Sequence, residues 1–319
     1  MDPCRVPVLL LAYNRLDTLQ QVWQALRQAK PATLFVSVDG PKPTLEDRAR
    51  VEAVRSFVQS HIDWPCDAYF HFYPDNQGCK LGVAGGIRWF FSQVEEGIVL
   101  EDDTLPHESF FAYAAHMLER YRAVSQVGCI AGLQPLTGWR LAYGWTFIRL
   151  PLIWGWASWR RAWEGYDPFL QEWPKLREEG FLQQALADNP SLLTLFQKQL
   201  DLLQAGQLDT WDVQWGFLLL RKKQLTVVPA RNMIRNLGIA HPLGLHTRKK
   251  RPWLNLPLEP WQEGEPPPAL LPDLPYERAW AYYFGAPHSW LKAWYRLGGD
   301  YPYRRFPWLH RFLEKYFLH

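Results

Sequence analysis

Cysteine is scarce in this sequence, and its few copies do not form the paired motifs that bind zinc. The four cysteines among the 319 residues are Cys4, Cys66, Cys79 and Cys129, and no Cys-x-x-Cys pair occurs. Their spacing argues against a zinc knuckle or a thioredoxin-type site. Because no disulfide framework is indicated either, we expect a protein of a reducing compartment.

Long apolar runs and a large net charge are also missing. No uninterrupted apolar stretch approaches the roughly 20 residues that cross a bilayer. The apolar run at 8–12 lies too close to Met1 to leave room for a cleavable leader. The net charge of +3 is too small to indicate a nucleic-acid partner. We therefore predict a cytoplasmic protein that binds no nucleic acid.

Proline and aromatic residues, in contrast, are abundant towards the C-terminus. Six prolines between 252 and 268 predict an extended linker over 252–275. Residues 276–319 mix aromatic with basic side chains. This mixture fits peripheral contact with an anionic membrane surface, or a C-terminal helix docked on the rest of the protein. We therefore divide the chain into residues 1–250 and an extension over 251–319.

Apolar runs alternate with helical patterns up to about residue 131, and the alternation breaks beyond it. Strands are predicted at 5–12, 33–38, 67–72, 98–100, 127–131 and 225–228, and helices at 16–29, 45–62, 86–95, 107–121, 176–206 and 209–220. Such alternation is typical of α/β proteins, in which a mainly parallel sheet carries helices on both faces.

Three adjacent carboxylates follow one of these strands. The apolar run 98–100 leads directly into Glu101, Asp102 and Asp103. Like charges at the end of a buried strand repel one another and lose hydration, so a hard cation or hydrogen-bond donors must lie against them. The carboxyl ends of strands open onto the ligand crevice in α/β proteins. We interpret the triplet as a site for a divalent metal ion and a phosphate-bearing ligand; an exposed acidic turn is the alternative.

Polar residues also follow the first two strands. Arg15 could neutralise a phosphate or stack on a base. Asp39 could accept a hydrogen bond from the N3–H of a uracil. Together with a carboxylate-held cation that bridges a diphosphate, these side chains compose a site for a nucleoside diphosphate. Without a ligand, Arg15 could cap a helix and Asp39 could belong to an ordinary turn.

A glycine-rich loop is predicted over 76–86, before the helix at 86–95. The loop contains neither a Walker-type lysine motif nor a dinucleotide-binding fingerprint. Gly82 would still allow the backbone to approach a ligand closely, and Lys80 could face a phosphate. A flexible loop without a ligand is the alternative.

Two further residues are candidates for the chemistry. Asp212 lies among large apolar residues, where a carboxylate could accept a proton from a substrate. Asp209 and Gln214 are the alternatives nearby, and both aspartates could simply belong to the start of a helix. His246, in a Gly/Pro-rich loop at 238–247, could supply a nitrogen ligand to manganese, although a loop histidine is more often a surface residue.

In order along the chain, these segments resemble glycosyltransferases of the GT-A fold that use nucleotide sugars. The matching segments are PVLLLAYNR (7–15), VSVDGPK (36–42), the loop 76–86, VLEDD (99–103), SFFAY (109–113), IWGWASWRRAW (153–163), TWDVQW (210–215) and NLGI with HT (236–247). The chain is similar to a bacterial group of hemolysin-like sugar transferases and, more distantly, to the N-acetylglucosaminyltransferases that begin complex N-glycans. The resemblance implies a Rossmann-like GT-A domain over 1–250, with a nucleotide-binding half at 1–125 and an acceptor-binding half at 126–250.

The resemblance also implies roles for single residues. Asp103 and His246 would bind Mn²⁺ or Mg²⁺, and Asp212 would act as general base. The residues placed beside the nucleotide sugar are Tyr13, Arg15, Asp39, Lys80, Gly82, Glu101 and Asp102. The tryptophan-rich segment 153–163 would offer flat faces to the acceptor sugar, or else belong to the core.

We therefore predict a metal-dependent enzyme that moves a sugar from a UDP-sugar to a hydroxyl of a glycan or lipid-linked acceptor, with inversion. One alternative is a sugar-nucleotide nucleotidyltransferase, a class that usually opens with a glycine-rich phosphate loop, which residues 12–16 lack. The other is a catalytically inactive carbohydrate-binding relative, against which the intact acidic triplet and Asp212 argue.

Overall fold

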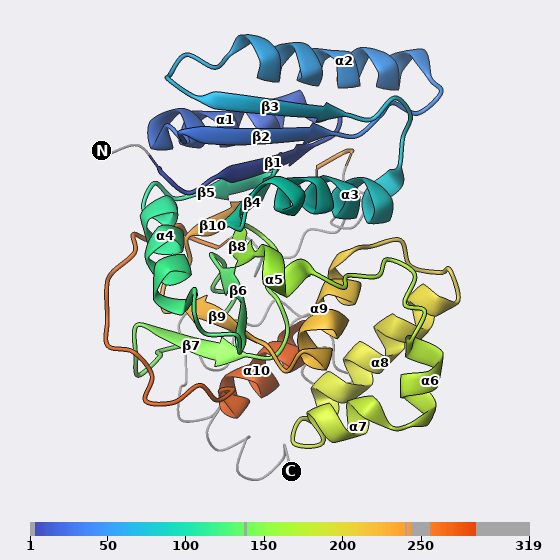
Figure 1. Cartoon of the computed structure of the whole chain (residues 1–319), viewed down its shortest axis with the longest axis vertical. Coiled ribbons are helices and arrows are strands. Elements are labelled where there is room, and N and C mark those ends of the chain that lie inside the picture. Colours follow the sequence, from blue (N-terminus) through green and yellow to red (C-terminus); the bar gives the residue numbers. More distant parts are fainter. Residues whose placement is uncertain (1–3, 137–138, 240, 244–255, 285–319) are drawn as a thin grey trace, which may run out of the picture.

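The computed structural model describes residues 4–136, 139–239, 241–243 and 256–284 of the chain (Figure 1). Within these residues, a large sheet of eight strands is accompanied by a sheet of two strands. The strands are β1 (Val8–Ala12), β2 (Thr33–Val38), β3 (Asp67–Phe72), β4 (Glu96–Glu101), β5 (Thr104–Pro106), β6 (Val127–Ala131), β7 (Trp145–Ile148), β8 (Trp156–Trp159), β9 (Leu225–Pro229) and β10 (Ile234–Asn236). The helices are α1 (Leu16–Ala29), α2 (Leu45–Ser60), α3 (Gly78–Gln93), α4 (Phe110–Tyr121), α5 (Arg160–Trp163), α6 (Trp173–Glu178), α7 (Phe181–Leu186), α8 (Pro190–Gln204), α9 (Asp212–Arg221) and α10 (Leu274–Phe284).

The strand order of the large sheet is β3-β2-β1-β4-β8-β6-β9-β7. β1 runs parallel to its neighbours β2 and β4, and β2 runs parallel to β3. β6 and β9 are also parallel, whereas β8 is antiparallel to β4 and β6, and β7 is antiparallel to β9. The prediction of a mainly parallel α/β sheet is confirmed. The antiparallel strands β7 and β8 were not predicted, because their tryptophan-rich sequence gives no alternation of apolar and polar residues.

Helices cover both faces of the sheet, as predicted. Side chains that alternate along a strand point to opposite faces. Val8 and Leu10 of β1 belong to a core with residues of α1, α2 and α4. Leu9 and Leu11 belong to a second core with residues of α3, α5 and α9. A third core, in the second half of the chain, contains residues of all five helices from α6 through α10.

Helix α3 begins at Gly78, so the prediction of a loop over 76–86 is wrong. The glycines of this segment serve close packing within a helix rather than flexibility. A Cβ at Gly86 would lie 2.7 Å from Leu11 Cδ2 and 2.8 Å from Ser37 Oγ, so α3 approaches the sheet more closely than a larger residue would allow. The propensity of glycine for loops misled the interpretation, since tertiary packing overrides it here.

The tryptophan-rich segment 153–163 contributes mainly to the core. Trp156, Trp159 and Trp163 are buried, in β8 and α5. Arg160 and Arg161, expected at the rim of an acceptor site, donate hydrogen bonds to backbone carbonyls of α3 and β6 instead. Of the two interpretations of this segment, the structural one therefore holds for these residues.

The described part of the C-terminal extension packs on the second half of the protein. Residues 256–273 form no helix or strand, as expected for an extended segment, but Leu256 is buried and the Asp273 N–H donates to the Phe147 carbonyl at 2.8 Å. In α10, Glu277 forms a buried ion pair with Arg149, with 2.5 Å between Nη2 and Oε2.

The predicted domain boundary at 250 and residues 285–319, which include most of the predicted membrane-contact segment, lie outside the described residues. Within those residues, no helix combines the length and the apolar character needed to cross a bilayer.

Candidate active site

Glu101, Asp102 and Asp103, called the acidic turn from here on, lie at the carboxyl ends of the parallel strands β1 and β4. Glu101 ends β4 in register with Leu11 of β1, and the Asp102 N–H donates to the Leu11 carbonyl at 2.9 Å. Thr104 closes the turn, because its hydroxyl accepts from the Glu101 N–H at 2.8 Å and donates to the Glu101 carbonyl at 3.0 Å. The acidic turn is thus held rigidly at the edge of the sheet where α/β proteins bind ligands.

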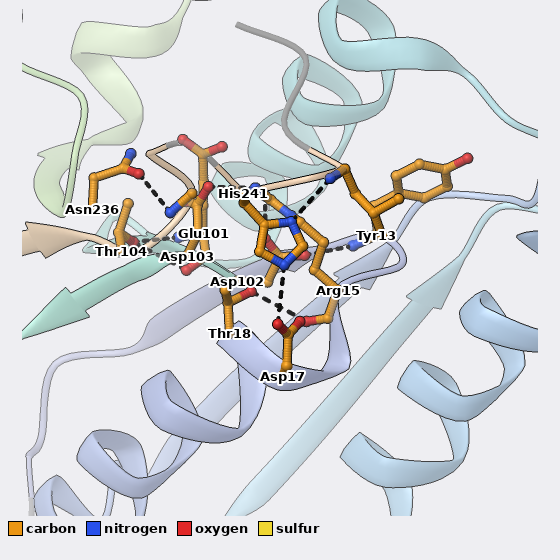
Figure 2. A network of polar contacts seen from close by, with 12 residues as sticks. Tyr13, Arg15, Asp17, Thr18, Glu101, Asp102, Asp103, Thr104, Asn236 and His241 are labelled. Atoms are coloured by element: carbon orange, nitrogen blue, oxygen red, sulfur yellow. Dashed lines mark hydrogen bonds and ion pairs between the residues drawn. The ribbon is translucent and has the colours of Figure 1, made fainter. Parts of the chain in front are cut away.

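Arg15 binds two of the three carboxylates. Its guanidinium donates from Nη1 to Asp103 Oδ2 at 2.6 Å and from Nη2 to Asp102 Oδ1 at 2.5 Å (Figure 2). The Asp102 side chain is 2% exposed, and its Oδ2 accepts from the Tyr13 N–H at 3.1 Å. Although burial alone would lower the pKa of Arg15, the charges of Asp102 and Asp103 raise it. Arg15 therefore stays charged and fixes both aspartates.

Glu101 is the carboxylate that Arg15 does not bind. None of the described residues donates a hydrogen bond to its side chain. Burial raises the pKa of Glu101, repulsion from Asp103 raises it further, and Arg15 opposes the shift. One guanidinium thus faces three carboxylates, and the excess negative charge requires a cation or a bound proton.

The carboxylates of the turn suit a hard divalent cation, although they do not form a complete metal cage. Among the described residues, no three His, Cys, Asp or Glu side chains form a cluster that could hold a metal ion. Arg15 binds one oxygen each of Asp102 and Asp103. The carboxylate of Glu101 and the second oxygen of Asp103 are the donors that could hold a cation, because Mg²⁺ and Mn²⁺ prefer such oxygens. His246, the other predicted metal ligand, lies outside the described residues.

Strand β10 and the residues after it cover the ion pair of Arg15 and Asp103. β10 pairs with β5, which directly follows the acidic turn, and the Leu237 N–H donates to the Asp103 carbonyl at 2.7 Å. A Cβ at Gly238 would overlap the Asp103 carboxylate and lie 2.9 Å from Arg15 Nη1. From the sequence, this segment supplied a matching motif and the candidate ligand His246 but no role for Gly238, because a close approach of two distant segments leaves no local signal.

A histidine of the same segment lies near the start of α1. The Nε2 atom of His241 is 3.0 Å from Asp17 Oδ2, as Figure 2 shows. Burial acts to raise the pKa of Asp17, but the hydrogen bond from His241 lowers it. This contact ties the covering segment to the helix that follows Arg15.

The side chain of Tyr13 points away from the acidic turn. Its hydroxyl donates to Asp47 Oδ2 at 2.6 Å, in the first turn of α2. Asp47 also accepts from Asn14 Nδ2 and from the Lys42 N–H, each at 2.6 Å. The contribution of Tyr13 to the acidic turn comes from its backbone N–H; its predicted contact with a nucleotide stays a prediction.

Asp39 holds the start of α3. Its Oδ1 accepts from the N–H groups of Gly40 and Gln77, each at 2.8 Å. Its Oδ2 accepts from Asn76 Nδ2 at 3.0 Å and from the Gly78 N–H at 3.2 Å. A carboxylate has about four acceptor positions, so protein donors fill those of Asp39. The reading of uracil by Asp39 stays a prediction, and its capping of α3 is an additional role.

Lys80 and Gly82 lie in the first turns of α3. The Nζ of Lys80 lies 5.3 Å from the ring centroid of Phe169, whose side chain is largely exposed. A Cβ at Gly82 would lie 3.2 Å from the Asp39 carboxylate, so this glycine lets α3 pack on Asp39. Contact of either residue with a phosphate stays a prediction.

Asp212 begins α9 and lies within electrostatic range of the acidic turn. Its carboxylate accepts a hydrogen bond from the Thr210 hydroxyl. The charge of Asp212 contributes to the raised pKa of Glu101. Asp209, the alternative base, lies against Gly78, since a Cβ there would be 3.5 Å from Asp209 Oδ2. Burial raises the pKa of Cys79 in the first turn of α3, and the charges of Asp212 and Asp209 add to this shift, so both candidate bases lie on the side of the site formed by the start of α3.

Comparisons with known proteins identify no family for this chain. No family model matches the sequence, and no curated protein matches it. HddC from Yersinia pseudotuberculosis, solved in complex with GMP-PN, is 10% identical with a TM-score of 0.32, over 50% of this chain and 80% of HddC. The UTP-bound UGPase from Acinetobacter baumannii is 9% identical with a TM-score of 0.35, over 75% of this chain and 95% of the UGPase. Similarity at this level supports no conclusion about the ligand or the reaction of this chain.

Proposed function

We propose that the protein is a transferase that acts on a nucleotide sugar, moving the sugar from a UDP-sugar donor to a hydroxyl of a glycan or lipid-linked acceptor. The main support is the ion pairing of Arg15 with Asp102 and Asp103, beside the carboxylate of Glu101, which Arg15 does not bind, at the carboxyl edge of β1 and β4. That edge is where α/β sheets bind ligands. A diphosphate and its cation would account for both the guanidinium and the excess carboxylates.

The charge of the acidic turn makes nucleotide binding dependent on a metal ion in this proposal. A diphosphate would face two uncompensated carboxylates, and this repulsion is strong where water is excluded. A divalent cation held by Glu101 and Asp103 would offset that charge and stabilise the leaving diphosphate. Arg15, oriented by its two aspartates, would add positive charge beside the phosphates.

Asp212 is the proposed general base. Its carboxylate would take the proton of the acceptor hydroxyl while that oxygen attacks the anomeric carbon and the bond to the diphosphate breaks. A single displacement of this kind inverts the anomeric centre. Asp209 is the second candidate for this role, because it lies on the same side of the site.

The two alternatives differ from this proposal in measurable ways. A nucleotidyltransferase would release pyrophosphate from a nucleoside triphosphate and a sugar 1-phosphate, whereas a glycosyltransferase would release UDP from a UDP-sugar. Residue Arg15 follows β1 without a glycine-rich phosphate loop, which favours the glycosyltransferase. An inactive carbohydrate-binding relative would release neither product.

The test is a thermal-shift screen of UDP, UDP-sugars and UTP with and without Mn²⁺. We expect UDP to raise the melting temperature only when Mn²⁺ is present, because ligands of the native state stabilise it. Asp103→Asn should abolish this shift. The matched control is Asp63→Asn, which removes an exposed carboxylate paired with Arg27 and should keep the shift.

The second step measures the products with the nucleotide that binds. Release of UDP supports glycosyl transfer, and Asp212→Asn should then keep the thermal shift but slow transfer by about 10²–10⁴-fold. Release of pyrophosphate would establish the nucleotidyltransferase instead. Indifference of the melting temperature to every nucleotide, with or without the metal, would refute the proposal.

A further inference from the structure

A small apolar cavity adjoins Asp212. Its volume is about 200 Å³, and its walls come from residues 150–154, α8, α9 and α10. Leu133, Leu150 and Phe196 are buried side chains of this lining. Ile153, Trp154 and Leu195 are only partly buried, so the cavity reaches the surface on their side.

The lining of the cavity favours an apolar occupant. Asp212 and Gln199 are its polar side chains, and the remaining side chains are aliphatic or aromatic. An apolar cavity of about 150 Å³ is large enough to bind benzene in another protein. The volume therefore suits a single ring or a short alkyl chain, and it is too small for an apolar group of drug size.

Asp212, the proposed general base, is one of the residues that line this cavity. A molecule whose apolar group occupies the cavity would thus carry its nearest hydroxyl beside the candidate base. Trp280 of α10 also lines the cavity, so the C-terminal extension contributes to it.

We propose that this cavity binds an apolar group of the acceptor, and that the glycan or lipid-linked acceptor carries a compact aryl or alkyl group close to its reacting hydroxyl. Its role as an acceptor site depends on the proposed function. In that reaction the hydroxyl gives its proton to Asp212, the oxygen forms a bond to the anomeric carbon, and the electron pair of the broken bond leaves with the diphosphate.

The experiment uses saturation-transfer NMR on the full-length protein without nucleotide. Benzyl alcohol serves as the aryl probe and hexan-1-ol as the alkyl probe. Glycerol, which has hydroxyl groups but no aryl or alkyl group of this kind, is the control. We expect signals from one or both apolar alcohols and none from glycerol. The stronger of the two signals identifies whether the cavity favours an aryl or an alkyl group.

Two variants of α8 localise the binding. Leu195→Trp adds bulk at a residue that lines the cavity and should weaken binding of the alcohol by about tenfold. Leu193→Trp makes the same change two residues away, at a partly buried residue that lines a different surface groove, and should leave binding unchanged. Circular dichroism confirms that both variants are folded.

The outcomes separate this inference from the proposed function. Equal signals from glycerol and the apolar alcohols, or equal weakening by both variants, would overturn the cavity assignment. Failure of all alcohols to bind, in a protein that UDP and Mn²⁺ stabilise, would overturn this inference alone. If the apolar alcohols bind specifically but no nucleotide changes the melting temperature, the cavity is still an apolar binding site, and its role as an acceptor site is refuted.

Discussion

At the scale of single residues, Arg15 supplies the positive charge that binds two of the three carboxylates of the acidic turn. Arg15→Met should leave Asp102 and Asp103 without their counter-charge, and removing one partner of a buried ion pair costs about 3–5 kcal/mol. We expect the free energy of unfolding in metal-free buffer to fall by about 3 kcal/mol or more. Addition of Mn²⁺ should then stabilise the variant more than the natural protein, because the metal ion can replace the guanidinium charge.

Urea denaturation with and without Mn²⁺ measures this effect. Arg27→Met is the matched control, since Arg27 pairs with Asp63 at the exposed surface and such pairs contribute less than about 1 kcal/mol. An Arg15→Met protein that is as stable as the natural one, and that Mn²⁺ does not affect, would show that the acidic turn needs no positive charge.

At the scale of elements, the start of α3 depends on the carboxylate of Asp39, the residue that follows β2. Asp39→Ala should lower the free energy of unfolding by about 1–2 kcal/mol even without nucleotide, because the first N–H groups of α3 lose their acceptor. Urea denaturation of the ligand-free protein measures this loss. Asp75→Ala, which changes a neighbouring exposed carboxylate, is the control. Unchanged stability with weaker UDP binding would instead favour the uracil-binding role.

The same element shows where sequence reasoning reached its limit. The strands at 33–38, 67–72 and 127–131 and the helix at 16–29 were predicted with the bounds that the structure shows. Apolar runs and helical periodicity are local signals, so they can be read from the chain alone. The start of α3 depends on Asp39, which is far away in the sequence, and the glycines of residues 76–86 favoured a loop.

At the scale of the whole molecule, α10 ties the C-terminal extension to the body of the protein. Glu277→Ala should lower the free energy of unfolding by about 3–5 kcal/mol, because it leaves the guanidinium of Arg149 without its buried partner. Glu259→Ala removes a more exposed partner of Arg231 and should cost less than about 1 kcal/mol. Equal losses in the two variants, measured by urea denaturation, would contradict a special role of the buried pair.

The candidate site was predictable in its acidic turn and less so in its surroundings. Polar residues after strands 5–12 and 98–100 predicted that Arg15 and the acidic triplet would lie at one edge, and the structure brings Arg15 into contact with Asp102 and Asp103. The direct ion pairs, the covering segment with Gly238 and the contribution of Trp280 to the cavity arise from contacts between distant parts of the chain. No pattern in a single segment encodes them.

Gly238 offers a way to sort related sequences by activity. Any side chain at this position would have to displace the Asp103 carboxylate or the guanidinium beside it, while the strands and helices could remain as they are. Homologues that have lost the activity can therefore carry a larger residue at this position and still keep the same fold. In an alignment of homologues, loss of this glycine would mark lineages that have turned to another purpose.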